Sequence, residues 1–349
     1  MQSSTEETLS WPRDPLLYFV DFPFRVNLYP FGFALELTSN SLDVIAAAQQ
    51  SCGPFPKLHD AETIHLRIGV SETGADELPQ PPVIRGRRDL ITIISDAANF
   101  GVCDVTGGFA FGWVTPAVAA NSAFFRYHFL DLMTGLLLAP IHFAIVHAAC
   151  VALNGHGVLL CGHSRAGKST LSFACAQRGW TFISDDASHA LRKNGGRTVI
   201  GNPLYLRLRE DAPALFPQLR ERAVVLRQNG EFGFEIPTAT LPGFATAFQC
   251  GIDHAVFLNR RPAGPATITP FPRDEALRRL ENVLEYTFAC KPSVGSRGQQ
   301  EEMALANPEA REEQKASIGE LLTAGVYELC YSDLDSAVDC LESLVRSGS

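Results

Sequence analysis

The sequence has few charged residues and no excess of positive charge. Charged side chains make up 19% of its 349 residues, and 29 lysines and arginines stand against 38 aspartates and glutamates, which gives a net charge of −9. An acidic chain is poorly suited to covering a phosphate backbone, so we expect no general nucleic-acid binding. Hydrophobic residues make up 46% of the chain. This content supports a large core and excludes a disordered chain, a coiled coil and a collagen-like fibre.

The chain also lacks the paired cysteines of zinc ribbons and redox motifs. Its nine cysteines are widely spaced and form no Cys-x-x-Cys pair. We therefore expect free thiols, no structural zinc and a reducing, cytoplasmic location. The first residues, Met1 to Asp14, carry two glutamates and no apolar stretch, so no signal peptide is expected.

One apolar stretch, residues 132–153, is about as long as a bilayer span. It contains Gly135, Pro140 and two histidines, and it has no basic flanks. We expect a buried helix that ends before Pro140 and then a buried strand, rather than a membrane span.

The length predicts two domains. Residues 1–140 show mostly strand patterns and are expected to form an accessory or substrate-binding region, whereas residues 141–349 are expected to form a catalytic domain. No internal repeat occurs, and no catalytic group of residues precedes about residue 145. The elements predicted first are strands at residues 31–38, 63–70, 90–95, 101–106 and 109–114, the last three forming a meander, and helices at residues 41–50 and 121–138. Those predicted after residue 185 are strands at residues 187–192, 198–200 and 255–259, helices at residues 274–286, 308–323 and 334–346, and a polar loop at residues 291–302 that could close over the site.

The most informative motif begins after residue 147. Two apolar runs flank Asn154-Gly155, which is a strong hairpin signal. The second run leads into Gly-x-x-x-x-Gly-Lys-Ser, the phosphate loop of nucleotide-binding proteins, and a helix over residues 169–178 closed by Gly179 follows. The predicted nucleotide-binding residues are Gly162, His163, Ser164, Arg165, Ala166, Gly167, Lys168, Ser169 and Thr170.

These residue types suit ATP and Mg²⁺. Glycines let backbone N–H groups turn toward a phosphate chain, and the helix N-terminus adds its dipole. Lys168 supplies a charge to the terminal phosphates, and the Ser169 hydroxyl can ligate Mg²⁺.

A short apolar strand at residues 180–184 ends in Asp185-Asp186. If this strand neighbours the phosphate-loop strand in a sheet, both carboxylates reach the bound phosphates. One carboxylate can then serve the metal while the other serves the attacking hydroxyl. A strand-end turn with two solvated acids is the alternative.

The block from His147 to Asp186 resembles the catalytic domain of HPr kinase/phosphorylase, a bacterial serine kinase that is structurally akin to the ATP-dependent phosphoenolpyruvate carboxykinases. The resemblance rests on the order of His147, Asn154-Gly155, residues 162–169, Arg178-Gly179 and Asp185-Asp186. It is strong over about 40 residues and loose as far as about Arg261. It implies an α/β fold with α+β character and a P-loop kinase domain.

The resemblance also implies roles for single residues. Asp185 would act as general base toward a substrate serine, and Asp186 would support either Mg²⁺ or the hydroxyls of the phosphate loop. His147 would lie near the phosphates and would sense or assist the acid. The chain departs from the family at Thr170, where a glutamate is usual, and it lacks the family's acid–glycine–asparagine signature. In that region it offers Arg207, Arg209 and Glu210, either as phosphate or metal contacts or as exposed charges on a strand.

Three functions remain open at this stage. The first is an ATP-dependent kinase acting on a serine of a protein or peptide. The second is a kinase of a small-molecule hydroxyl, and the third is a nucleotide-binding switch with weak ATPase activity. No nucleic-acid partner is expected, and the assembly state is left open, a homo-oligomer included.

Overall fold

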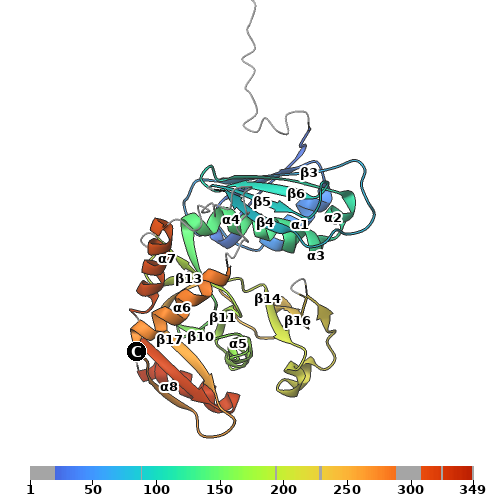
Figure 1. Cartoon of the computed structure of the whole chain (residues 1–349). Coiled ribbons are helices and arrows are strands. Elements are labelled where there is room, and N and C mark those ends of the chain that lie inside the picture. The colour runs from blue at the N-terminus through green and yellow to red at the C-terminus, as the bar shows by residue number, and fades with distance from the viewer. Residues whose placement is uncertain are drawn as a thin grey trace, which may run out of the picture.

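The structure is a computed structural model that describes residues 20–87, 89–192, 195–227, 230–287, 308–323 and 325–347. It is an α/β protein with two large sheets and one small sheet (Figure 1). The loop predicted at residues 291–302 lies outside the described residues. Every described cysteine is a free thiol, as expected.

Seven strands form the first sheet, in the order β1-β2-β3-β7-β6-β5-β4. β3 pairs in parallel with β2 and with β7, and the other pairs are antiparallel. The predicted meander is confirmed as β5, β6 and β7. The strands are β1 (Phe24–Leu28), β2 (Leu35–Ser39), β3 (Ile64–Val70), β4 (Val83–Arg87), β5 (Leu90–Ile94), β6 (Phe100–Asp104) and β7 (Phe109–Val114).

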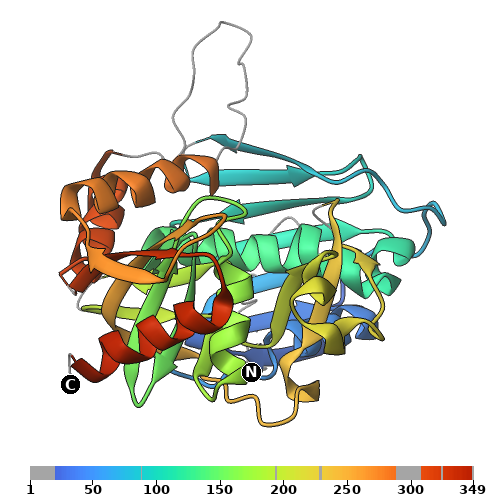
Figure 2. The ribbon, with the colours of Figure 1, turned by 90° about the horizontal axis from the view of Figure 1, so that it is seen from below.

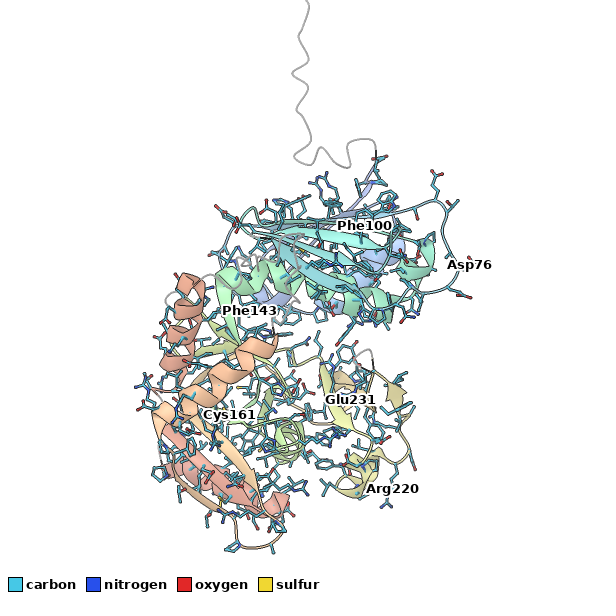
Figure 3. All side chains as sticks on the ribbon, in the orientation of Figure 1. Asp76, Phe100, Phe143, Cys161, Arg220 and Glu231 are labelled. Carbon is cyan, nitrogen blue, oxygen red and sulfur yellow. The ribbon has the colours of Figure 1, made fainter. Side chains whose placement is uncertain are left out.

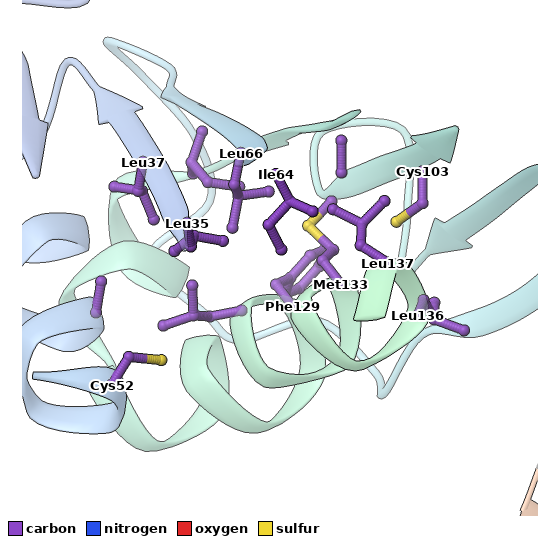
Figure 4. Close-up of a cluster of buried hydrophobic side chains, with 14 of the residues drawn as sticks. Leu35, Leu37, Cys52, Ile64, Leu66, Cys103, Phe129, Met133, Leu136 and Leu137 are labelled. Atoms are coloured by element: carbon purple, nitrogen blue, oxygen red, sulfur yellow. The ribbon is translucent and has the colours of Figure 1, made fainter. Parts of the chain in front are cut away.

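Helices cover one face of this sheet (Figure 1). Phe129, Met133 and Leu137 pack against strand residues such as Leu66 and Cys103 to form the first core cluster (Figure 4). The helical segments are α1 (Leu42–Cys52), α2 (Pro116–Ala120), α3 (Ser122–Phe125), the π-helical turn η3 (Arg126–Leu130) and α4 (Asp131–His142).

Two predictions in this part are wrong in detail. The strand predicted at residues 31–38 begins only at Leu35, because Phe31 and Gly32 have positive φ in a short helical turn. Phe31 packs instead against Phe143 and His189 of the second sheet, with ring centroids 5.6 and 4.4 Å away.

Helix α4 was expected to end before Pro140, but it continues to His142. Proline removes only one hydrogen bond in this last turn. The carbonyl groups at this helix end find partners in Arg192, whose guanidinium donates to the Pro140 oxygen and whose backbone N–H donates to the His142 oxygen. The strand expected after the helix is present. Among the described residues, no helix is long and apolar enough to cross a bilayer.

The chain passes directly from α4 into β8 (Phe143–Val146), the first strand of a nine-stranded sheet. Figure 3 labels Phe143 at this junction. Its main path is β11-β9-β10-β17-β13-β12-β8, and β19 pairs with both β17 and β18. The division into domains at residue 140 stays a prediction. The other strands are β9 (Ala148–Leu153), β10 (His156–Cys161), β11 (Thr181–Ser184), β12 (Ser188–Leu191), β13 (Thr198–Ile200), β17 (Gln249–Arg260), β18 (Thr267–Pro270) and β19 (Gly325–Tyr331).

Helices cover both faces of this second sheet (Figure 2). α5 (Lys168–Gln177) and α8 (Leu334–Ser347) share one core cluster, whereas α6 (Arg273–Thr287) and α7 (Pro308–Leu321) share another with the opposite face. The small sheet has the order β14-β16-β15 and packs beside α5. Its strands are β14 (Tyr205–Arg209), β15 (Val225–Leu226) and β16 (Phe232–Pro237).

Candidate active site

The phosphate-loop sequence joins a strand to a helix, as its motif predicts. β10 ends at Cys161, the loop follows, and α5 begins at Lys168. Arg165 and Gly167 have φ of 70° and 97°. A Cβ atom at Gly167 would lie 2.4 Å from the Tyr331 hydroxyl oxygen. The loop therefore requires glycine at residue 167, because both the backbone conformation and the space exclude a side chain.

The helix after the loop ends as predicted at Gly179, which has φ of 89°. The Trp180 N–H donates to the Cys175 oxygen and the Gly179 N–H donates to the Ala176 oxygen. This is a Schellman motif, and it stops α5 after three turns. Trp180 is then fully buried and begins the segment that leads to Asp185.

Lys168 lies at the centre of the site and is only 5% exposed. Its Nζ donates to the backbone oxygens of Gly162 and His163 at 3.0 and 3.2 Å. Nζ also lies 3.1 Å from His147 Nε2. Burial lowers the pKa of Lys168, and the charge of Asp186 partly offsets this effect. The amine is thus held at the mouth of the loop, where the motif requires a cation.

His147 bridges Lys168 and Asp186. Its Nδ1 lies 3.3 Å from Asp186 Oδ1, while its Nε2 faces the lysine amine. Burial lowers the pKa of His147, and Asp186 opposes this shift. A neutral imidazole with the proton on Nδ1 satisfies both contacts, because Nδ1 then donates to the carboxylate and Nε2 accepts from the amine.

Asp185 is buried, with 3% of its surface exposed. Its Oδ2 accepts a hydrogen bond of 2.5 Å from the Arg207 backbone N–H, and its backbone oxygen accepts one of 3.0 Å from the Ser169 hydroxyl. Burial raises the pKa of Asp185 to about 6, although the positive charge of Arg207 opposes the shift. A carboxylate with this pKa can take up a proton near neutral pH.

The sheet topology explains how these residues meet. β11 runs in the same direction as β10, but β9 lies between them and is antiparallel to both. β10 and β11 are therefore not neighbours, so the condition from which the sequence analysis argued is not met. Their carboxyl ends still share one edge of the sheet, and β9 begins at that edge directly after His147. Lysine, histidine and both aspartates consequently converge there.

The donor set at this edge fits Mg²⁺. The Ser169 hydroxyl and the Asp186 carboxylate, the two predicted metal ligands, are hard oxygen donors of the kind that Mg²⁺ prefers, and their role as ligands stays a prediction. In the described part of the chain, no three His, Cys, Asp or Glu side chains form a metal-binding group. Mg²⁺ commonly takes only one or two protein ligands and completes its shell with phosphate and water.

The other predicted residues of the loop differ in their exposure. Thr170 is half-buried at the start of α5, and His163, Ser164 and Arg165 are exposed at the loop tip, where His163 Nδ1 lies 2.6 Å from the Ser164 oxygen. Ala166 is buried.

The structure does not bring together Arg207, Arg209 and Glu210, the three residues that stand where the family's signature is expected. Arg207 touches the site through its backbone, and its guanidinium lies 3.5 Å from Glu235. Arg209 pairs loosely with Glu231 at 3.9 Å on the exposed side of β14, and Glu210 is exposed just after that strand. Only Arg207 therefore lies at the site.

The sequence analysis missed one supporting residue. The Tyr331 hydroxyl donates to the Ala166 oxygen at 3.1 Å and is buried beneath the phosphate loop. Tyr331 comes from β19, far along the chain, and no local pattern connects it to the loop.

Comparisons with known proteins add little to this geometry. No protein-family model matches the sequence, and no curated protein matches it. Among solved structures, the chain is similar to the HPr(Ser) kinase/phosphatase from Coxiella burnetii, with 15% sequence identity and a TM-score of 0.28 over 58% of this chain and 95% of that chain. A TM-score this low establishes neither a shared fold nor a shared function.

Proposed function

We propose that the protein is an ATP-dependent kinase that transfers the γ-phosphoryl group to a hydroxyl, namely the serine of a protein or peptide. The observation that carries the proposal is the convergence of two groups at one sheet edge. A phosphate loop with a buried lysine lies beside a buried carboxylate whose pKa is raised to about 6. The choice of serine as acceptor follows from the sequence resemblance described above.

Each residue has a role in this reaction. The acceptor oxygen attacks the γ-phosphorus, the new O–P bond forms, and the bond between the γ-phosphorus and the bridging oxygen breaks to release ADP. Asp185 takes the hydroxyl proton, and Lys168 neutralises charge on the phosphates. Mg²⁺, when bound, would neutralise charge on the β- and γ-phosphates. His147 holds the side chains of Lys168 and Asp186 in position through its two ring nitrogens.

The test separates binding from chemistry. The protein is incubated with γ-labelled ATP, Mg²⁺ and proteins or peptides encoded by neighbouring genes, and phosphoserine is sought by mass spectrometry. Asp185→Asn should keep ATP affinity in calorimetry but reduce phosphoryl transfer about 10²–10⁴-fold, the usual effect of losing a general base. Lys168→Ala should abolish tight binding of Mg·ATP.

Matched controls are available at exposed positions. Asp76→Asn and Lys57→Ala make the same chemical changes on the surface and should leave both measurements unchanged. Unchanged ATP affinity in Lys168→Ala would contradict the phosphate-loop assignment. ATP hydrolysis without any phosphorylated acceptor would favour a nucleotide-binding switch instead.

A further inference from the structure

A pocket of about 550 Å³ lies beside the phosphate loop and has no role in the reaction proposed above. Loop residues His163 and Arg165 form one wall, and Asn259, Arg260 and Arg261 form another at the carboxyl end of β17. β17 flanks β10 on the side opposite β9 and β11. The pocket therefore begins at the loop and extends away from Asp185 and Asp186.

The lining is strongly basic in an otherwise acidic protein. It contains four arginines, at positions 165, 260, 261 and 279, and one carboxylate, Glu328. Arg279 is satisfied, because it pairs with Glu275 at 3.0 Å and stacks on Phe271. Within the described ranges, the guanidinium groups of Arg165, Arg260 and Arg261 have no ion-pair or hydrogen-bond partner. Three arginines thus line one cavity, and none of them has a salt-bridge partner in the part of the chain that the structure describes.

The rest of the lining is not that of a simple anion site. Leu258 and Pro262 add apolar surface. The Asn259 side-chain amide donates to Glu328 Oε1 at 3.3 Å, so an amide and a carboxylate lie together in the wall. Apolar surface, a few fixed polar groups and stacking cations are what a purine nucleoside requires, because its base has two flat faces and a polar edge.

We infer that this pocket binds the purine base and ribose of the nucleotide, with the guanidinium groups of Arg260 and Arg261 packed against the base and its sugar. The inference rests on the proposed function, because it takes the phosphate loop to hold the triphosphate. It adds that β17 carries the residues that recognise the nucleoside. The location agrees with the general rule that ligands of open α/β sheets bind outside the carboxyl ends of the strands.

The experiment compares two probes that share a phosphate chain. Isothermal calorimetry measures the binding of Mg·ATP and of Mg·tripolyphosphate, which has three phosphates but no nucleoside. The unaltered protein should bind ATP at least about tenfold more tightly. The double variant Arg260→Ala, Arg261→Ala should lower ATP affinity about 10- to 100-fold and leave tripolyphosphate affinity within about threefold.

The control removes two positive charges elsewhere. Arg220 and Arg278 are exposed and do not line the pocket. Changing both to alanine reproduces the change in net charge and should leave the ATP affinity within about threefold. Thermal melting of each variant verifies that the fold is kept, which is expected because all four side chains are exposed.

The alternative outcomes are distinct. An equal loss of affinity for both probes overturns the inference, because the arginines would then act on the phosphate chain. Two bound tripolyphosphates in the unaltered protein and one in the double variant also overturn it, by revealing a separate anion site. Equal affinity of the unaltered protein for both probes, abolished by Lys168→Ala, overturns the nucleoside site but leaves the proposed kinase intact. No binding of either probe overturns both.

Discussion

Replacing Asp185 with asparagine should make the folded protein more stable at neutral pH while strongly reducing its activity. The side chain is 3% exposed, and burial raises its pKa from the ordinary 3.8 to about 6. Its Oδ2 accepts a hydrogen bond from the Arg207 backbone N–H. Asparagine has nearly the same shape and keeps a carbonyl oxygen that can accept this bond, but it carries no charge to bury.

The magnitude follows from the pKa. A shift of about 2 units corresponds to about 3 kcal/mol. Because the folded chain binds this proton more tightly than the unfolded chain does, the stabilising contribution is complete below pH 3.8. It is lost progressively as the pH rises to about 6. Above pH 6 the native protein carries the full cost of a buried carboxylate, and the asparagine variant does not. The variant should therefore be up to about 3 kcal/mol more stable at pH 8 and nearly equal to the unaltered protein at pH 4.

Urea unfolding measures this difference directly. Both proteins are unfolded between pH 4 and pH 8 without nucleotide and without Mg²⁺, since either ligand would stabilise the native state. Asp76→Asn is the matched control, because Asp76 lies in an exposed loop and its substitution should change stability by less than about 0.5 kcal/mol. A difference between Asp185→Asn and the unaltered protein that does not vary with pH would refute the reasoning. So would a variant that is less stable at pH 8.

Three further outcomes are expected. Gly167→Ala should destabilise the loop by about 1–3 kcal/mol and weaken ATP binding, because residue 167 has φ of 97° and the new Cβ meets Tyr331. Urea unfolding measures the first effect and calorimetry the second. Gly179→Ala is the control, because φ there is 89° but the space is open, and this variant should keep its ATP affinity. His147→Gln should lower turnover about tenfold with unchanged ATP affinity, since glutamine bridges Lys168 and Asp186 less well. A steady-state assay with the identified acceptor measures turnover. Unchanged turnover would show that His147 has no role in the reaction. The phosphorylated product, given millimolar phosphate and Mg²⁺ without ATP, should release little or no pyrophosphate, because the signature that serves this reverse step in the resembling family is absent; release at the forward rate would contradict this.

Local sequence patterns were sufficient to predict the loop at residues 162–169 and the strand and helix that flank it. The Asn154-Gly155 turn has φ of 52° and 87° at its two residues and joins β9 to β10 as predicted. Gly179 ends α5, and the strand after it leads to Asp185. The residue preferences of turns, helix caps and alternating strands depend on only a few neighbouring residues, so they can be recognised in the sequence itself.

Long-range pairing was not predictable in the same way. β17 was expected only at residues 255–259, but it runs from Gln249 to Arg260 because β10, β13 and β19 all pair with it. β19 was not predicted at all. Phe31 was assigned to a strand, yet it packs against the second sheet. In each case, contacts with residues far along the chain outweigh local preference.

The sequence by itself determined which residues are candidates for the chemistry, and the tertiary structure decided how they meet. Lys168, His147 and the two aspartates were identified from motif and resemblance, but only the antiparallel β9 between β10 and β11 brings the histidine between lysine and Asp186. The same holds for Asp185, whose pKa is raised by burial, while the N–H and the charge of Arg207 in β14 oppose the shift. A motif specifies local geometry, whereas desolvation and charge depend on every atom that surrounds the group, wherever it lies in the chain.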